Sequence, residues 1–310
     1  MTTIAIELIS SSHTFLIRMH SLLKLKVIAV YGACLTTFLL LTTGCAGSIS
    51  SAPRETALQR VLKSGKIRCS YLVYSSYFQK NPNTGKLSGI FYDVMEEVGK
   101  DAGLQIDWVE EVGFQSIFPG LDTNRYDVFA AGLWPNTSRA KAASFTVPVN
   151  YSAITAWVRP DDHRFDSDLN LIDSPSIKIA TIDGAMEDLI AKTSFPKAAR
   201  VSLPELSPFV QNLLNVVGKK ADVTFAEPMI VAEFLKTNKD KLRQIGADKP
   251  IRIFGNCLAV KTGETELRDF LNVALLEIVQ DGRVDKILKR YESSPNYFYP
   301  LARPYVLPER

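Results

Sequence analysis

The fold class follows from three consecutive segments, IRCSYLV (Ile67–Val73), YDVMEEVGKDA (Tyr92–Ala102) and LQIDW (Leu104–Trp108). The first predicts a buried strand. The second predicts a helix, because its apolar residues recur at helical spacing, and the third alternates apolar and polar residues as a strand does. A helical stretch around residues 117–121 and a strand at Tyr126–Ala131 follow. This order of elements predicts a largely parallel sheet with helices on both faces.

The same order of elements recurs further along the chain. We expect strands at Ile177–Ile182, Arg200–Leu203 and Asp222–Ala226, with a helix that opens near Ala185 and another at Pro208–Val217. The sequence therefore predicts two similar α/β units in tandem. Ligands of such sheets bind beyond the carboxyl ends of the strands, so two facing units would place a site in a cleft between them.

The C-terminal part is strongly helical, with apolar stripes over residues 267–278 and 284–291. We expect these helices to pack on the first unit, so that Ile154–Val158 and Leu258–Val260 form two crossings between lobes. Lobe 1 would then comprise residues 61–155 plus 257–310, and lobe 2 residues 156–256. The last stretch, with Pro300, Pro304 and Pro308, is expected to be an extended strap.

The N-terminus has the pattern of a secretory signal rather than of a folded domain. Lys24 and Lys26 precede an uncharged run of 15 residues, Val27–Leu41, which is short for a membrane span. Small residues then lead to Gly44-Cys45, which resembles the end of a bacterial lipoprotein signal, although Thr42 replaces the usual leucine. We expect a signal peptide at 1–44 (with Met19 as a possible true start), lipidation of Cys45, and a tether at 45–60. An uncleaved signal anchor is the alternative.

Charge and composition exclude several classes of function. Three basic residues and one acid precede Cys45, so the mature chain has 33 basic and 32 acidic residues and a net charge of +1. A nearly neutral chain lacks the excess of positive charge that is typical of nucleic-acid-binding proteins. Only His163 remains among the histidines, and no metal-ligand spacing is present, so neither a metal nor a cofactor is expected. Cys69 and Cys257 are interpreted as two separately buried thiols, with a disulfide as the alternative.

A series of short motifs runs through the mature chain in a fixed order. They are Leu62–Arg68, Tyr74–Tyr77, Gly85–Gly89 with Asp93, Phe114–Leu121, Asp127, Arg139, Phe145–Pro148, Ile182–Met186 and Gly218–Pro228. From about Ala57 to Tyr291 they resemble family 3 of the bacterial solute-binding proteins. The resemblance implies the two-lobed type II periplasmic binding protein fold, an α/β architecture with two mostly parallel sheets joined by two crossing strands, and a polar amino acid as the ligand.

The resemblance also implies roles for individual residues. Tyr74 and Phe114 would lie against the ligand, and Arg139 would hold its carboxylate, a task suited to a planar, always charged guanidinium. The turn at Gly184 would offer backbone N–H groups to that carboxylate. Glu227 would pair with the ligand ammonium. Taken alone, Arg139 would fit a surface arginine, and Glu227 a helix N-terminal acid next to Pro228.

Four positions depart from the family pattern and make the expected pocket more apolar. Phe91 stands where the family has an acid, Met186 where it has a hydroxyl, and Gly132 and Trp134 where it often has serine or threonine. Tyr74, Tyr77, Phe114 and Trp134 would then stack on an aromatic ring or surround an organic cation, unless half of them are core residues.

The expected function is that of a monomeric receptor, anchored in the cell envelope by lipid on Cys45, which passes a small amino-acid-like ligand to the permease subunits of an ABC importer. Two alternatives remain open. One is a periplasmic dehydratase of the same fold acting on a prephenate- or arogenate-like substrate, with Glu227 or Asp93 as acid or base. The other is a sensor module without a transport role.

Overall fold

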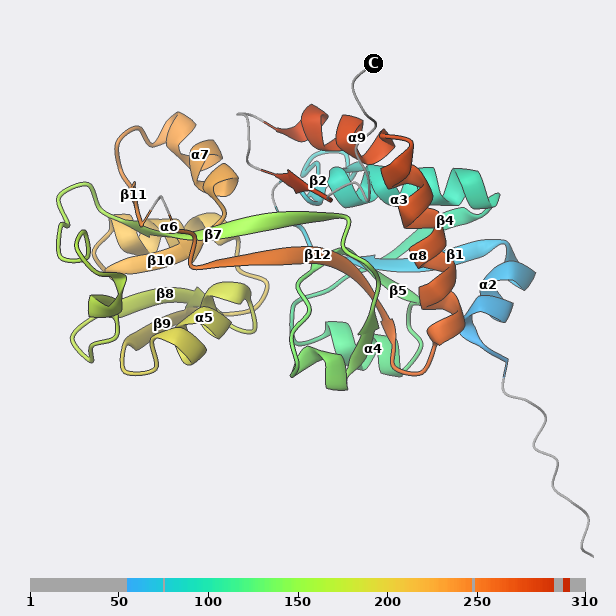
Figure 1. Ribbon diagram of the computed structural model, residues 1–310, viewed down its shortest axis with the longest axis horizontal. Coiled ribbons are helices and arrows are strands. Elements are labelled where there is room, and N and C mark those ends of the chain that lie inside the picture. Colours follow the sequence, from blue (N-terminus) through green and yellow to red (C-terminus); the bar gives the residue numbers. More distant parts are fainter. Residues whose placement is uncertain (1–54, 75, 247–248, 293–297, 302–310) are drawn as a thin grey trace, which may run out of the picture. The chain divides into compact units, whose positions relative to one another are not determined.

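The computed structural model describes residues 55–74, 76–246, 249–292 and 298–301 (Figure 1). The expected signal peptide, its alternative start and Cys45 lie outside the described residues, so these predictions stay predictions. Glu55–Arg310 forms one compact unit, in which two lobes each contain a sheet flanked by helices. None of the helices in the described ranges is long and apolar enough to cross a membrane.

Lobe 1 is built on a sheet with the order β4-β1-β5-β12. Its parallel strands are β1 (Lys66–Tyr71), β4 (Gln105–Glu111) and β5 (Val128–Leu133), and β12 (Arg252–Lys261) runs antiparallel to β5. The helices are α2 (Ala57–Ser64), α3 (Ile90–Ala102), α4 (Ile117–Asp122), α8 (Thr265–Gln280) and α9 (Arg283–Tyr291). The short strands β2 (Gln79–Lys80) and β3 (Leu87–Ser88) form a hairpin, and a 3₁₀ turn spans Arg139–Lys141.

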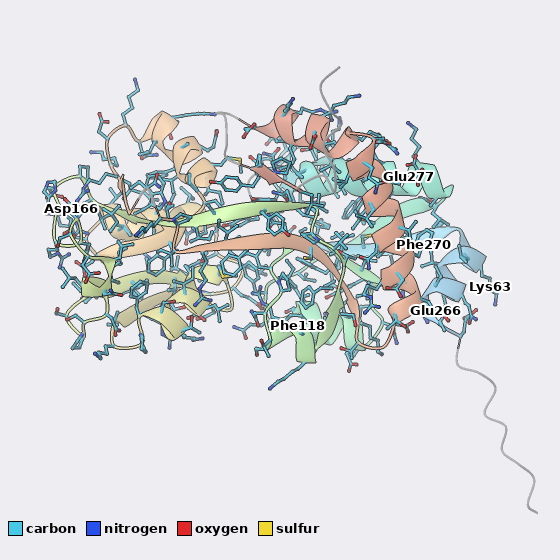
Figure 2. The ribbon with its side chains drawn as sticks, viewed as in Figure 1. Lys63, Phe118, Asp166, Glu266, Phe270 and Glu277 are labelled. Atoms are coloured by element: carbon cyan, nitrogen blue, oxygen red, sulfur yellow. The ribbon has the colours of Figure 1, made fainter. Side chains whose placement is uncertain are left out.

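The helices of lobe 1 follow the apolar patterns of the sequence. Helix α3 buries its expected stripe and ends at Gly103, whose φ of 65° is the left-handed cap that glycine accepts without strain. Helices α8 and α9 contact α3, which confirms that the C-terminal helices pack on the first unit. Helix α2 begins at Ala57, inside the range expected to be a tether. Thr56 donates a hydrogen bond to Glu266 of α8 over 2.8 Å, and Figure 2 shows Glu266 beside α2.

Lobe 2 repeats the arrangement with the strand order β7-β10-β8-β9. Strands β8 (Lys178–Ile182), β9 (Ala199–Leu203) and β10 (Val223–Ala226) are parallel, and β11 (Arg243–Ile245) pairs with the far side of β7 (Asn150–Val158). The helices are α5 (Met186–Ser194), α6 (Phe209–Val217) and α7 (Pro228–Thr237), and a 3₁₀ turn spans Leu169–Ile172. In each lobe the carboxyl ends of the parallel strands point toward the other lobe, as the predicted cleft requires.

Two strands cross between the lobes, but at a different place from the one expected. The crossing ladder pairs Asn150–Ile154 of β7 with Arg252–Asn256 of β12 (Figure 1). The expected crossing segment Leu258–Val260 instead lies in lobe 1, where it pairs with β5 and β6 (Ala143–Phe145). Most of Ile154–Val158 likewise pairs within lobe 2. The expected apolar segments are therefore the C-terminal ends of β7 and β12, whereas the N-terminal halves of these strands form the crossing.

Two smaller predictions can also be compared with the structure. Tyr299–Pro300 forms a short strand, β13, on β7, whereas Pro304 and Pro308 of the expected strap lie outside the described residues. Cys69 and Cys257 are free and buried, on β1 and β12 with β5 between them, which confirms two separate thiols.

Candidate functional site

A cavity of about 210 Å³ opens between the two lobes. Lobe 1 contributes the chain after β1, the end of β5, and Arg139. Lobe 2 contributes the turn after β8, the start of α5, and residues 205–209 before and at the start of α6. Each wall is thus formed at the carboxyl ends of parallel strands, where the backbone leaves the sheet and side chains can converge.

Six of the eight binding residues expected from the sequence line this cavity: Tyr74, Phe114, Gly132, Trp134, Arg139 and Met186. The other two lie directly behind the wall. Gly184 accepts a hydrogen bond from Arg139 through its carbonyl oxygen. Glu227 accepts one from the phenol of Tyr74 but does not itself form part of the cavity surface. The structure therefore brings together the residues that the motifs place far apart in sequence.

Arg139 reaches from lobe 1 to lobe 2. Its Nη1 donates to the carbonyl oxygen of Trp134 over 2.9 Å, and its Nη2 donates to that of Gly184 over 2.9 Å. The guanidinium also lies 6.0 Å from the centre of the Phe114 ring. No acidic side chain in the described part of the chain pairs with it, and desolvation lowers its pKa to about 10. A desolvated cation with unused donors is poised to bind an anion.

The aromatic residues divide between the cavity wall and the core. Tyr74 packs edge-to-face on Phe209 with ring centres 5.7 Å apart, and both line the cavity. Trp134 stacks on Phe254 at 4.7 Å, which leaves only part of its indole for a ligand. Tyr77 is a core residue and not a wall residue, and its hydroxyl is 2.7 Å from that of Ser152. The expected four-residue aromatic cage is thus corrected to a wall in which Phe209 takes the place of Tyr77.

Gly132 and Phe91 form a matched pair in this wall. Gly132 has a φ of 78°, and a Cβ at this position would lie 2.4 Å from an atom of the buried Phe91 ring. The glycine is therefore required by both its backbone conformation and its neighbour. Phe91 stands where the family has an acid. Its ring occupies the space that a side chain at position 132 would need.

Glu227 is a buried acid at the junction of the lobes. It is 2% exposed, follows β10, and accepts a hydrogen bond from the Tyr74 phenol of lobe 1 over 2.7 Å. Its Oε1 is buried without a hydrogen-bond partner in the described residues. Burial raises the pKa of Glu227 to about 7, and burial together with this carboxyl raises the pKa of Tyr74 well above its usual value.

Glu187 is a cavity residue that the sequence analysis missed. It is 3% exposed, lies in the first turn of α5 and lines the cavity beside Met186. Its Oε1 accepts from the backbone N–H of Ile182 over 3.1 Å and from Asn212 over 3.4 Å. Burial raises its pKa to about 8. From sequence, an acid in a first helical turn is typical of ordinary dipole stabilisation, so only burial distinguishes it.

Glu205 is a second missed residue, and it joins the lobes directly. It lines the cavity from lobe 2, and its carboxylate accepts from the backbone N–H of Gln115 over 2.6 Å and from Ser116 Oγ over 3.4 Å. A Cβ on Gly113 would lie 2.5 Å from the Glu205 carboxyl carbon, so the glycine makes room for this contact. The contact holds lobe 1 and lobe 2 together at the rim of the cavity.

Two acids of the motifs are structural and lie away from the cavity. Asp127 forms a two-pronged ion pair with Arg68, with contacts of 2.7 and 3.1 Å. Asp93 accepts from Arg290 over 2.7 Å and from Tyr291 over 2.9 Å, which attaches α9 to α3. Asp93 is thus occupied in packing, not in an acid–base site as the dehydratase alternative allowed.

His163 is not among the described residues that line the cavity. His163 lies 2.8 Å from Asp166 in an exposed loop, and Figure 2 shows Asp166 at the end of lobe 2 remote from lobe 1. Within the described ranges, no group of three or more His, Cys, Asp or Glu residues is arranged to hold a metal ion.

The chain belongs to the bacterial extracellular solute-binding proteins, family 3, whose sequence model matches residues 72–294. Among curated relatives, a Haemophilus influenzae protein named "Probable amino-acid ABC transporter-binding protein" is 26% identical over 210 residues, covering 68% of this chain and 78% of the relative. The L-cystine-binding protein TcyA of Bacillus subtilis is 26% identical over 220 residues, covering 70% and 77%.

Solved structures support the fold. The ancestral amino acid-binding protein AncCDT-1, described as a precursor of cyclohexadienyl dehydratase, superposes with a TM-score of 0.66 at 22% identity, covering 76% of this chain and 99% of that chain. An ABC transporter binding component from Wolinella succinogenes, complexed with lysine, gives a TM-score of 0.66 at 21% identity, covering 74% and 97%. The predicted type II periplasmic fold is thereby confirmed.

Proposed function

We propose that this solute-binding protein is an extracytoplasmic receptor that captures a small amino-acid-like ligand between its lobes and delivers it to an ABC importer. The observation that carries the proposal is Arg139, a desolvated guanidinium that lines the cavity and has no acidic partner among the described residues. A ligand carboxylate would supply the missing charge through a planar two-pronged contact. The names of the curated relatives, an amino-acid binding protein and an L-cystine-binding protein, agree with this chemistry.

The proposed mechanism is closure of the lobes around the ligand. Three side chains already connect them: Arg139 to Gly184, Tyr74 to Glu227, and Glu205 to the loop before α4. Each is a polar contact that opening would expose to water. A ligand held from both walls adds interactions that exist only in the closed form, so it shifts the population toward closure. The permease subunits of the importer would recognise the closed form.

The proposal is tested by a thermal-shift screen of the purified protein against the twenty common L-amino acids. A ligand that binds only the folded state stabilises it by about 2.7 kcal/mol at a hundredfold excess over its dissociation constant. We expect a clear shift with at least one amino acid, and a much smaller shift for the same amino acid at the same concentration in Arg139→Ala. The matched control is Arg268→Ala, which removes an arginine whose partner is the adjacent Asp269. A screen in which no amino acid shifts the wild type contradicts the proposal.

The proposal includes attachment to the membrane through lipid on Cys45, which agrees with the extracellular location in the family's name. Metabolic labelling with a radioactive fatty acid tests this, since Cys45→Ser should abolish both labelling and sedimentation with membranes. A variant that is still labelled and still sediments would contradict it. We further propose a monomer, which sedimentation velocity tests directly.

A dehydratase is the second candidate function, and Glu187 is the observation that favours it. Its raised pKa of about 8 keeps this cavity carboxyl protonated at neutral pH, as a general acid requires. Arg139 would then hold a substrate carboxylate. Incubation with prephenate and arogenate, followed by chromatography, distinguishes the candidates. Turnover that Glu187→Gln abolishes would favour the enzyme, whereas binding without turnover favours the receptor.

A further inference from the structure

One side chain of lobe 1 lies in the apolar core of lobe 2. The backbone of Trp134 follows β5 in lobe 1, and its carbonyl oxygen accepts the hydrogen bond from Arg139. The indole of Trp134 is 7% exposed and belongs to the buried cluster of lobe 2, together with Ile179 and Phe225. The other buried members of this cluster all come from residues 154–245. The indole therefore spans the boundary between the lobes.

The crossing strand β12 holds this indole in two ways. The ring stacks on Phe254, with ring centres 4.7 Å apart and planes inclined by 6°. The indole Nε1 donates a hydrogen bond to the side-chain oxygen of Asn256, two residues further along the same strand. Both residues belong to the ladder that β12 forms with β7 between the lobes (Figure 1). The position of the Trp134 indole is thus set by the strands that join the lobes.

A buried chain of hydrogen bonds continues from Asn256 back into lobe 1. The side-chain nitrogen of Asn256 donates to Ser152 of β7 over 2.6 Å, and the Ser152 hydroxyl oxygen is 2.7 Å from that of Tyr77. These three residues are at most 2% exposed. A buried polar group that loses its partner is left without a hydrogen bond, so each member of the chain constrains the next. The chain therefore holds the Asn256 amide in the orientation that accepts from Trp134.

Trp134 differs from the other apolar contacts between the lobes because it also lines the cavity. Met229 and Ile230 at the start of α7 make a reciprocal contact with the buried cluster of lobe 1, but they are not among the described residues that line the cavity. The three polar contacts between the lobes can exchange their partners for water when the lobes separate. An indole that leaves an apolar core instead exposes apolar surface to water. Burial of Trp134 therefore opposes separation of the lobes at the cavity wall itself.

We propose that Trp134 is a latch that favours the closed arrangement of the lobes in the protein without ligand, and that Asn256, held by Ser152 and Tyr77, positions this latch. A ligand that packs against the indole would strengthen a contact that already exists, so less of its binding free energy is needed for closure. The inference concerns the lobes alone and applies to any class of ligand. It can therefore be tested without one.

The test follows the hydrogen exchange of two backbone N–H groups by NMR in the ligand-free full chain. The N–H of Gln115 donates to Glu205 across the lobes over 2.6 Å, so it exchanges when the lobes separate. The N–H of Asp127 donates to the Arg68 carbonyl within lobe 1 over 2.8 Å, so it reports unfolding of that lobe. The readout is the ratio of the Gln115 exchange rate to the Asp127 exchange rate. A merely structural role of the indole would raise both rates and would not raise this ratio.

Three variants test the latch. Trp134→Ala removes the indole, and we expect the exchange ratio to rise by about tenfold or more. Trp134→Phe keeps an aromatic ring but loses the Nε1 donor, and should raise the ratio by about threefold. The matched control is Trp157→Phe, which removes a buried indole whose Nε1 donates to a carbonyl within lobe 2 over 3.4 Å. The ratio should change by less than about twofold in the control, because the hydrogen bond it loses does not cross between the lobes.

The role of Asn256 is tested by a double-mutant cycle. Asn256→Leu keeps a side chain of similar size and removes both hydrogen bonds of the amide. In the wild-type background it should raise the exchange ratio by about threefold or more. In the Trp134→Phe background it should raise the ratio by less than about twofold, because the donor through which Asn256 acts is already absent. An equal rise in both backgrounds would overturn the positioning role of Asn256.

The latch is overturned if Trp134→Ala and Trp134→Phe both leave the exchange ratio unchanged, or if Trp157→Phe raises it as much as Trp134→Phe does. If Trp134→Ala does not fold, the comparison of Trp134→Phe with its control decides. No ligand is present in these measurements. Failure of the latch therefore leaves the proposed function standing, and failure of the proposed function leaves the latch standing.

Discussion

Replacement of Arg139 is the perturbation whose consequences the structure defines most closely. Arg139 has five N–H donors, of which one goes to the carbonyl of Trp134 and one to that of Gly184. Arg139 and Phe114 both line the cavity, so the remaining donors are available to a ligand there. Arg139→Ala removes the whole group. Arg139→Lys keeps the charge but loses the planar fork, so it cannot make both carbonyl contacts and a two-pronged carboxylate contact together.

The size of the effect follows from these contacts. Truncation of one partner of a buried, hydrogen-bonded charge pair costs about 2–5 kcal/mol of binding free energy, which is about 30-fold to several thousandfold in the dissociation constant. We expect Arg139→Ala to fall in this range and Arg139→Lys to fall between it and the wild type. The free energy of unfolding without ligand should change by less than about 2 kcal/mol, because two hydrogen bonds are lost while a desolvated charge is also removed.

Isothermal titration calorimetry measures the affinities, and urea denaturation measures the stability of each ligand-free variant. Binding that is lost together with stability would mean that Arg139 supports the fold, which is not what we expect. Wild-type affinity in Arg139→Ala would refute the assignment of the carboxylate to this residue. An affinity of Arg139→Lys equal to that of the wild type would show that charge alone suffices and that the fork has no role.

Three further predictions concern the lobes and the buried acids. Between about pH 5 and 8 the free energy of unfolding should fall as pH rises, because Glu187 and Glu227, with pKa values raised to about 8 and about 7, bind protons more tightly in the native state. Urea titrations at each pH should show this free energy of unfolding falling by at most about 1.4 kcal/mol per pH unit for each group. A free energy of unfolding that does not change with pH would contradict the prediction. Gly132→Ala should lower the free energy of unfolding by at least about 2 kcal/mol, because the new Cβ would clash with the Phe91 ring. The control is Gly103→Ala, which has a similar φ but open space around it and should cost about 1 kcal/mol. Equal losses of stability in the two variants would exclude the clash with Phe91. Glu205→Ala removes two hydrogen bonds between the lobes, so small-angle scattering should give a larger radius of gyration for the ligand-free variant, and an unchanged radius counts against the closing role.

Local periodicity predicted the longer elements because helices such as α3 and α8, and strands such as β1 and β5, bury apolar residues at regular spacing. The crossing strands show where this signal ends. The apolar segments 154–158 and 258–260 mark burial within each lobe, whereas the residues that span the lobes include polar Asn150 and Ile253, which is 58% exposed. A two-stranded connection with an exposed face has no continuous apolar pattern to identify it. The order of strands across the chain, by contrast, follows from the tandem arrangement itself.

The position of Arg139 in the cavity wall was predictable because a motif identifies this residue. The surroundings of a buried side chain were not predictable from the sequence. Glu187 lines the cavity and contacts no lysine or arginine of the described residues, whereas the neighbouring Asp188 pairs with Lys192 and Arg200. The absence of an ion pair cannot be inferred from the spacing of residues in the sequence. The burial of Glu227 behind Tyr74 is likewise a property of the assembled lobes.

The most direct test of the central claim is a pair of calorimetric titrations on the purified protein. One uses each of the twenty common L-amino acids, and the other uses the matching amine that lacks the carboxylate. We predict that at least one amino acid binds with one site per chain and that its decarboxylated amine binds at least about 30-fold more weakly, since Arg139 then has no anion to hold. Equal binding of the amine, or no binding of any amino acid, would contradict the account.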